Sequence, residues 1–137
     1  MLLLNLLIVS ALPSAPAASH SKHYEKLARA YFRAWNDHDS ASLSTLLAES
    51  ASLRDWNVEK QGRQAVVDAN VDIWKAVPKI AIDIHEIHVA ERAKLYTVVT
   101  CEIMVKLNNG KDAALKVADV ITFDEHDRIL SVRAYKG

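Results

Sequence analysis

The chain has 137 residues, half of them hydrophobic and a quarter charged, which suits one domain with a real apolar core and excludes a disordered tail. Basic and acidic residues number 17 each, so the chain lacks the basic excess that is typical of nucleic-acid binders. Cys101 is the only cysteine, which excludes an intrachain disulfide and a thiolate metal cluster.

The N-terminus is apolar and carries no charged side chain before Lys22. Its apolar run, residues 2–12, is too short to cross a bilayer, which takes about 20 residues. Small residues and prolines follow, and Ala15-Pro16-Ala17 resembles a cleavage site, so we predict a signal peptide over residues 1–18 and a secreted protein. The alternative is a cytoplasmic protein that retains the apolar segment and packs it on the fold or on a partner.

Three helices are predicted in the first half of the chain. An apolar stripe at helical spacing predicts the first over residues 23–36. Ser40 or Ser42 is placed to cap a short second helix that continues through Leu47. Residues 51–56 alternate as a strand, and residues 57–62 are expected to form a polar loop. A third apolar stripe predicts a helix over residues 65–77, which Pro78 ends.

The rest of the chain is predicted to be β. A first strand begins at Ile80, and a slip in its apolar phase places a bulge near His85 or Glu86. Asn108-Asn109-Gly110 is a strong hairpin signal, and residues 125–128 form another turn. Further strands are expected over residues 95–107, 112–124 and 129–136. Helices followed by a β meander define an α+β domain over residues 19–137, with a cone-shaped, curved antiparallel sheet wrapped around the helices and a cavity between them.

Three polar side chains fall on faces that are otherwise apolar. Alternation puts Asp119 on the same strand face as Val117, Ile121 and Phe123. Tyr31 lies in the middle of the first helical stripe, and Asp55 ends the apolar face of the first strand. Taken singly, Tyr31 could be a core tyrosine and Asp55 a loop cap, but a lone carboxyl among large aliphatic groups needs a partner.

Together these three groups would have a clear chemical use. A buried carboxyl has a raised pKa and can stay protonated, so Asp119 could donate a hydrogen bond beside the Tyr31 phenol and form an oxyanion hole. A better solvated carboxylate, Asp55, could move a proton next to a carbonyl. We expect the Tyr31 hydroxyl and the Asp119 carboxyl to lie roughly 2.6–3.2 Å apart or to share one acceptor.

From about Leu27 to Gly137 the chain resembles the nuclear transport factor 2-like (NTF2-like) superfamily, and within it the SnoaL-like and ketosteroid isomerase branch. The segments that carry the resemblance are ARAYFRAWNDHD, ASLRDW, GRQAVVDA, VADVITFDEHDRI and SVRAYKG. The resemblance to the ketosteroid isomerases implies that Tyr31 is the oxyanion-hole phenol, Asp55 the base and Asp119 the acid. In those enzymes this acid is an aspartic acid that stays protonated at neutral pH. Asp119 also matches the acid/base aspartate of SnoaL-type polyketide cyclases. Trp56 and Asn70 depart from the isomerase pattern, which has a proline turn and a second pocket tyrosine there.

We therefore predict an isomerase or cyclase that acts on a small apolar molecule with a ring, the alternative being a non-catalytic small-molecule-binding or dimerisation module. A homodimer is expected, with Ala118 and Val120 on its interface, and nucleic acid and a stable membrane span are not. No cofactor motif is present, and His85 and His88 would point to opposite faces of a strand, so neither a cofactor nor a metal site is predicted. The predicted substrate contacts are Trp35, Trp56, Asn70, Trp74, Met104, Ile121 and Phe123.

Overall fold

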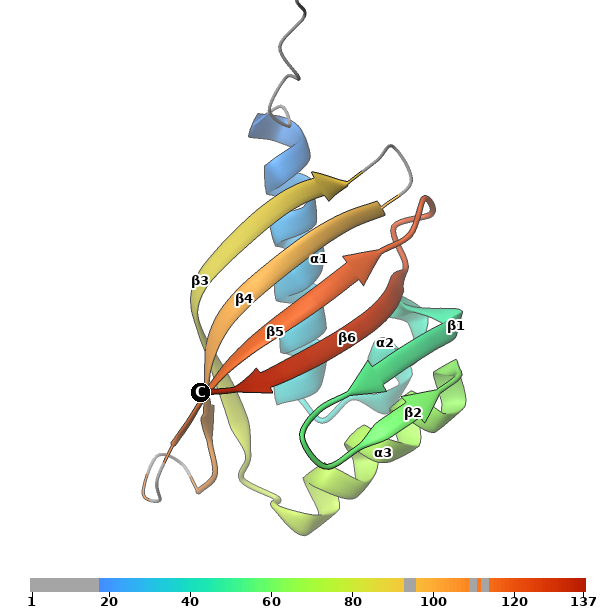
Figure 1. Ribbon diagram of the computed structural model, residues 1–137. Helices are drawn as coiled ribbons and strands as arrows, with labels where there is room; N and C mark the ends of the chain where they lie inside the picture. The colour runs from blue at the N-terminus through green and yellow to red at the C-terminus, as the bar shows by residue number, and fades with distance from the viewer. Residues whose placement is uncertain (1–17, 93–95, 109–110, 112–113) are drawn as a thin grey trace, which may run out of the picture.

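A computed structural model describes residues 18–92, 96–108, 111 and 114–137. The helices are α1 (Ala18–Asn36), α2 (Ser40–Leu46) and α3 (Arg63–Ala76). The strands are β1 (Leu47–Arg54), β2 (Glu59–Gln61), β3 (Ala81–Arg92), β4 (Tyr96–Lys106), β5 (Leu115–Phe123) and β6 (Ile129–Lys136) (Figure 1). The predicted α+β class is confirmed.

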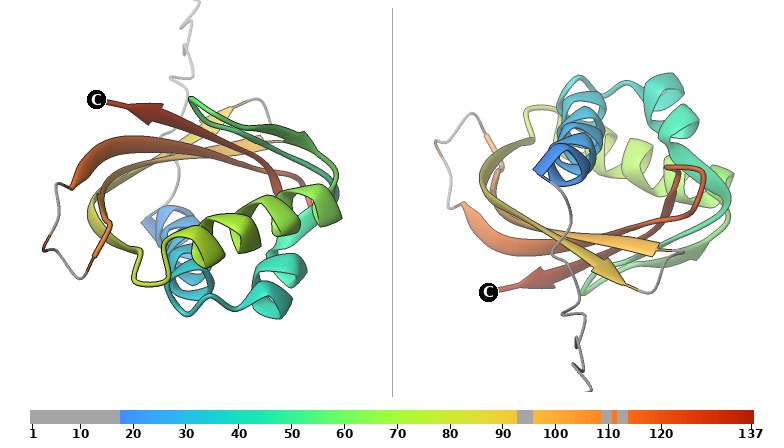
Figure 2. Two further views of the ribbon diagram at one scale, coloured as in Figure 1. Left: turned by 90° about the horizontal axis from the view of Figure 1, so that it is seen from below. Right: turned by 90° about the horizontal axis from the view of Figure 1, so that it is seen from above.

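The strands form one curved sheet in the order β2-β1-β6-β5-β4-β3. All neighbours are antiparallel except β1 and β6, which run parallel, so the sheet is mixed rather than purely antiparallel. The parallel pair joins the first strand of the sheet to the last, a pairing that hairpin signals in the sequence do not reveal. Figure 2 shows the helices gathered on the concave side of the sheet.

Helix α1 lies inside the curve of the sheet because its apolar stripe is continuous. Tyr24, Ala28, Tyr31 and Trp35 of this stripe are all buried, and the helix packs against β3 and β4. The β3–β4 register shifts between Ile84 and Glu86, which confirms the predicted bulge. A bulge bends its strand and increases the local twist, so it lets the sheet curve around α1.

The first half of the chain differs from the prediction at several boundaries. Helix α1 begins at Ala18, earlier than predicted. The N-cap of α2 is Asp39 and not a serine, because its carboxylate accepts a hydrogen bond from the backbone N–H of Ser42 at 3.0 Å. Leu47 begins β1 rather than ending α2. Residues 59–61 of the predicted loop form β2, a short exposed edge strand without the apolar alternation that would have revealed it.

The turn at residues 125–128 is confirmed. The Asp124 carboxylate accepts hydrogen bonds from the backbone N–H groups of His126 (2.8 Å) and Arg128 (3.0 Å), which closes the β5–β6 hairpin. The predicted signal peptide, apart from Ala18, and the tip of the predicted turn at residues 108–110 lie outside the described residues. No helix in the described part of the chain is both long and apolar enough to cross a membrane.

Candidate active site

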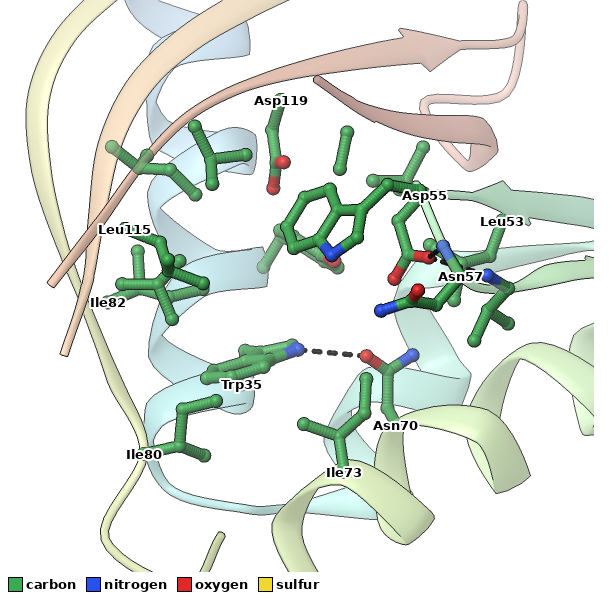
Figure 3. A pocket seen from close by; sticks show the side chains of 18 of the residues that line it. Trp35, Leu53, Asp55, Asn57, Asn70, Ile73, Ile80, Ile82, Leu115 and Asp119 are labelled. Atoms are coloured by element: carbon green, nitrogen blue, oxygen red, sulfur yellow. Dashed lines mark hydrogen bonds between the residues drawn. The ribbon is translucent and has the colours of Figure 1, made fainter. Parts of the chain in front are cut away.

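A cavity of about 230 Å³ lies between the concave face of the sheet and helices α1 and α3. Most of its wall is aliphatic, from β3 to β6 and the end of α3. The structure brings the three predicted catalytic residues together in this wall: Tyr31 from α1, Asp55 from the end of β1 and Asp119 from β5. Figure 3 shows the Asp119 and Asp55 carboxyls projecting into the same space.

Asp119 lies in the middle of β5, opposite Cys101 of β4 and Ala134 of β6. It is only 5% exposed, and its carboxyl makes no hydrogen bond or ion pair with any residue that the structure describes. Burial and, to a smaller extent, the negative charge of Asp55 together raise the pKa of Asp119 from 3.8 to about 7. Asp119 is therefore a hydrogen-bond donor in slightly acidic solution and can exchange a proton near neutral pH.

Tyr31 is 3% exposed and lines the same cavity. Burial raises the pKa of its phenol well above the usual value, and the charge of Asp119 raises it further, so the hydroxyl stays protonated. The structure contains no hydrogen bond between the Tyr31 hydroxyl and the Asp119 carboxyl, so the expected direct contact is absent. Both groups line one cavity, and neither donates a hydrogen bond to a described residue. Both donors are therefore available to one acceptor atom of a ligand.

Cys101 lies beside these two groups but is not part of the cavity wall. It is fully buried, and burial raises the pKa of its thiol to about 12. It therefore stays an uncharged thiol and packs as a small apolar side chain.

Asp55 is partly exposed at the mouth of the cavity and is held by the loop that follows β1. Its Oδ1 atom accepts hydrogen bonds from the backbone N–H groups of Asn57 at 2.7 Å and Val58 at 2.6 Å. Its own N–H donates to the Val58 carbonyl at 2.9 Å. Asp55 is thus a loop cap as well as a cavity residue, and its Oδ2 atom makes no hydrogen bond within the described chain.

Asn70 of α3 is buried where a second pocket tyrosine was expected. Its Oδ1 atom accepts a hydrogen bond from Trp35 Nε1 at 2.8 Å, and its Nδ2 atom donates to the Val66 carbonyl at 2.8 Å (Figure 3). Through these bonds the Asn70 amide orients the Trp35 indole, and it makes no bond to the Tyr31 hydroxyl. The Tyr31 hydroxyl therefore has no supporting side chain behind it among the described residues.

Of the predicted substrate contacts, Trp35, Trp56 and Asn70 line the cavity, and Trp74, Met104, Ile121 and Phe123 do not. Met104 lies on the outer face of β4, because the buried residues of that strand are the odd-numbered ones. Phe123 packs on Tyr24 with ring centroids 5.4 Å apart, at the far end of α1. Trp74 packs against Trp35 and stacks on His38, and Ile121 is fully buried in the core.

Several lining residues were not predicted. The inward positions of β3 to β6 could have been found from strand alternation, whereas Asn57 and Val58 lie in the loop after Asp55 and carry no such signal. The remaining wall is formed by Leu53, Ile73, Ile80, Ile82, Ile103, Val105, Leu107, Leu115, Val117, Val132 and Ala134.

The histidines near the bulge do not lie at this cavity. His88 pairs with Glu102 at 3.2 Å on the outer face of the sheet, where both side chains are well exposed. Among the residues described by the structure, no group of three or more His, Cys, Asp or Glu side chains is placed to hold a metal ion.

The fold and the position of the cavity define an NTF2-like protein. The sequence profile of the SnoaL-like domain matches residues 28–132, so the chain belongs to the SnoaL-like domain family. No curated protein shows significant sequence similarity to the chain.

Solved structures of low sequence identity share this fold. A proposed dehydratase of the NTF2-like family from Streptomyces avermitilis matches with a TM-score of 0.72 at 18% identity, over 87% of this chain and 96% of that chain. A proposed polyketide cyclase from Sinorhizobium meliloti matches with a TM-score of 0.64 at 21% identity, over 84% and 98% of the two chains. A proposed isomerase of the SnoaL-like family from Agrobacterium tumefaciens matches with a TM-score of 0.67 at 16% identity, over 85% and 98%.

Proposed function

We propose that the protein catalyses proton transfer next to a carbonyl of a small apolar molecule that contains a ring, by isomerising a double bond or closing a ring. The observation that carries this proposal is the pair of buried hydrogen-bonding groups, Tyr31 and Asp119, that line one apolar cavity without a hydrogen-bond partner among the described residues. Buried polar groups are normally hydrogen-bonded, so two unused donors in the wall of one cavity favour a ligand oxygen there. The names of the similar structures, a proposed isomerase and a proposed polyketide cyclase, agree with this class of reaction.

Each of the three residues has a distinct role in this reaction. The substrate carbonyl oxygen accepts hydrogen bonds from the Tyr31 hydroxyl and the protonated Asp119 carboxyl. The Asp55 carboxylate removes a proton from the carbon next to the carbonyl, and the electron pair of that C–H bond moves to the oxygen as an enolate. The two donors stabilise this charge among the aliphatic side chains of the cavity wall. Asp55 then returns the proton at the γ carbon of a β,γ-unsaturated substrate. In a cyclisation the enolate carbon instead attacks a second carbonyl, the π bond of that carbonyl breaks, and its oxygen takes the proton from Asp55.

The loop after β1 supports the role of Asp55 as the base. Two backbone N–H groups hold Oδ1, so the carboxylate cannot rotate freely, and Oδ2 is the oxygen that remains for the substrate. A fixed carboxylate loses little entropy when it takes the proton. The same bonds favour the alternative function, a binding module without chemistry, because capping the loop would by itself explain an aspartate at this position.

The test replaces each group with the least structural change. Asp55→Asn keeps an oxygen for the two backbone N–H groups but removes the basic charge, while Tyr31→Phe and Asp119→Leu each remove one donor. We expect turnover of a β,γ-unsaturated cyclic ketone or a cyclisable polyketide mimic to fall by roughly 10²–10⁴-fold for the base and roughly 10²–10³-fold for each donor.

Asp124→Asn is the matched control, because Asp124 caps a turn through two backbone N–H groups in the same manner but lies outside the cavity. It should leave turnover unchanged. A wild-type protein that turns over neither substrate, and binds a phenol that mimics the enolate no better than the three variants, would show that the enzyme proposal is wrong.

A further inference from the structure

Trp56 differs from the other two tryptophans in lying at the mouth of the cavity. It lines the cavity and is also 43% exposed, whereas Trp35 and Trp74 are each 6% exposed. Its indole makes no hydrogen bond with any described residue. A large aromatic surface shared between a cavity and solvent is well suited to cover a bound ring, because stacking removes both apolar surfaces from water.

The ring of Trp56 is held from its backbone and from one side-chain contact. It is the residue after Asp55, inside the turn that the Asp55 carboxylate closes onto Asn57 and Val58. The Nζ atom of Lys136, which does not line the cavity, lies 5.9 Å from the centroid of the Trp56 ring, within the range of a cation–π contact. A ring restrained in this way loses less entropy when a ligand stacks on it.

The size of the cavity limits how many rings can stack there. An engineered apolar cavity of about 150 Å³ holds one benzene molecule, which has six carbon atoms. At the same ratio, a cavity of about 230 Å³ holds roughly nine non-hydrogen atoms, which corresponds to one ring with substituents, and the second of two fused rings would reach the mouth beside Trp56. A skeleton of four fused rings exceeds this volume.

We propose that Trp56 stacks on the ring of the substrate, and that the substrate is a flat molecule of one or two fused rings whose single inner oxygen binds Tyr31 and Asp119. This inference rests on the proposed function and names the substrate class of the same cavity. Trp56 is the residue that selects flat rings over puckered ones, while Tyr31 and Asp119 select the oxygen.

The test compares two phenols that have the same carbon skeleton and differ in the flatness of the second ring, 2-naphthol and 5,6,7,8-tetrahydro-2-naphthol. Titration calorimetry should show that the wild-type protein binds 2-naphthol about three- to tenfold more tightly, the range expected for one aromatic stacking contact. Trp56→Leu should remove this preference, and Trp56→Phe should keep most of it. Tyr96→Leu, which changes an equally exposed aromatic residue outside the cavity, should behave as wild type.

The outcomes separate this inference from the proposed function. If Trp56→Leu keeps the wild-type preference while Tyr31→Phe and Asp119→Leu weaken 2-naphthol binding, stacking by Trp56 is wrong and the proposed function stands. If the preference depends on Trp56 but neither donor variant weakens binding, stacking stands and the proposed function fails. Binding of 17β-estradiol, a phenol with four fused rings, as tightly as 2-naphthol would overturn the size limit.

Discussion

At the scale of single residues, the carboxyl of Asp119 is the most unusual group in the molecule. It lies between aliphatic side chains on the inner face of β5, and nothing in the described protein neutralises or hydrogen-bonds it. The ionised form is therefore poorly solvated, which is why its pKa rises to about 7. Natural proteins keep such groups when function needs them, because an apolar side chain of the same size would stabilise the fold more.

The first prediction concerns the pH dependence of stability. Below about pH 4 the Asp119 carboxyl is protonated in both states, and between about pH 4 and 7 only the unfolded chain loses the proton. The free energy of unfolding should therefore fall as pH rises through this window, by on the order of 4 kcal/mol once the group is fully ionised. Asp119→Asn lacks this effect, so urea unfolding should show the variant gaining stability relative to wild type between pH 5 and pH 8.

Asp72→Asn is the control for this prediction, because it removes an exposed carboxylate from α3. Its difference from wild type should be the same at both pH values. A constant difference for Asp119→Asn as well would mean that the buried carboxyl is not protonated in the native state.

The second prediction concerns the coupling of the two carboxyls. The negative charge of Asp55 contributes to the raised pKa of Asp119, so Asp55→Asn should lower that pKa toward its ordinary value. The carboxyl carbon of Asp119, followed by NMR in protein labelled with ¹³C aspartate, should titrate at lower pH in the variant. An unchanged midpoint of the Asp119 titration would show that the charge of Asp55 does not affect the pKa of Asp119.

At the scale of elements, the end of α1 is fixed to the edge of the sheet by one side chain. Asn36 donates from Nδ2 to the Ile82 carbonyl at 2.9 Å and accepts from the Ile82 N–H at 2.7 Å. Since β3 is the edge strand, the amide occupies the backbone groups that a further strand would otherwise pair. Ile82 lines the cavity, so this pair of bonds also sets the position of one cavity wall.

The third prediction tests this link. Asn36→Ala should lower the free energy of unfolding by about 1 kcal/mol, the lower end for two hydrogen bonds because the site is partly solvated. Asn36→Asp keeps the acceptor for the Ile82 N–H and should lose less, as measured by urea unfolding. Equal loss in both variants would contradict a role for the accepted bond.

The elements also show which parts of the site could be predicted from sequence. Asp119 and Tyr31 were assigned to the inner surface correctly, because strand alternation and helical spacing depend only on local periodicity. Asn57 was not predicted as a cavity residue, because its position is set by the turn that Asp55 caps and not by strand alternation or helical spacing. The partner of Trp35 was missed too, since Asn70 reaches it from another helix. The short strand β2 has no apolar face, so its pairing with β1 could not be recognised.

At the scale of the whole molecule, the outer face of the sheet remains uncovered by helices (Figure 2). The outward residues of β5 are Lys116, which is exposed, and Ala118, Val120 and Thr122, which are short side chains and only partly exposed. An outer sheet face that meets only water usually carries longer polar side chains. We therefore propose that this face pairs with a second copy of the chain, leaving the cavity mouth of each protomer open.

The last prediction tests this pairing. Val120 lies opposite Thr100 of β4 and Arg133 of β6 on the outer face, so Val120→Lys would place a second positive charge beside Arg133 and disrupt a self-complementary contact. Light scattering after gel filtration should show a wild-type dimer and a Val120→Lys monomer. Gln64→Lys, on the exposed side of α3, adds the same charge elsewhere and should remain dimeric.

Val120 faces away from the cavity, so the Val120→Lys monomer should still bind 2-naphthol. If the wild-type protein is itself a monomer, the outer face is not a dimer interface.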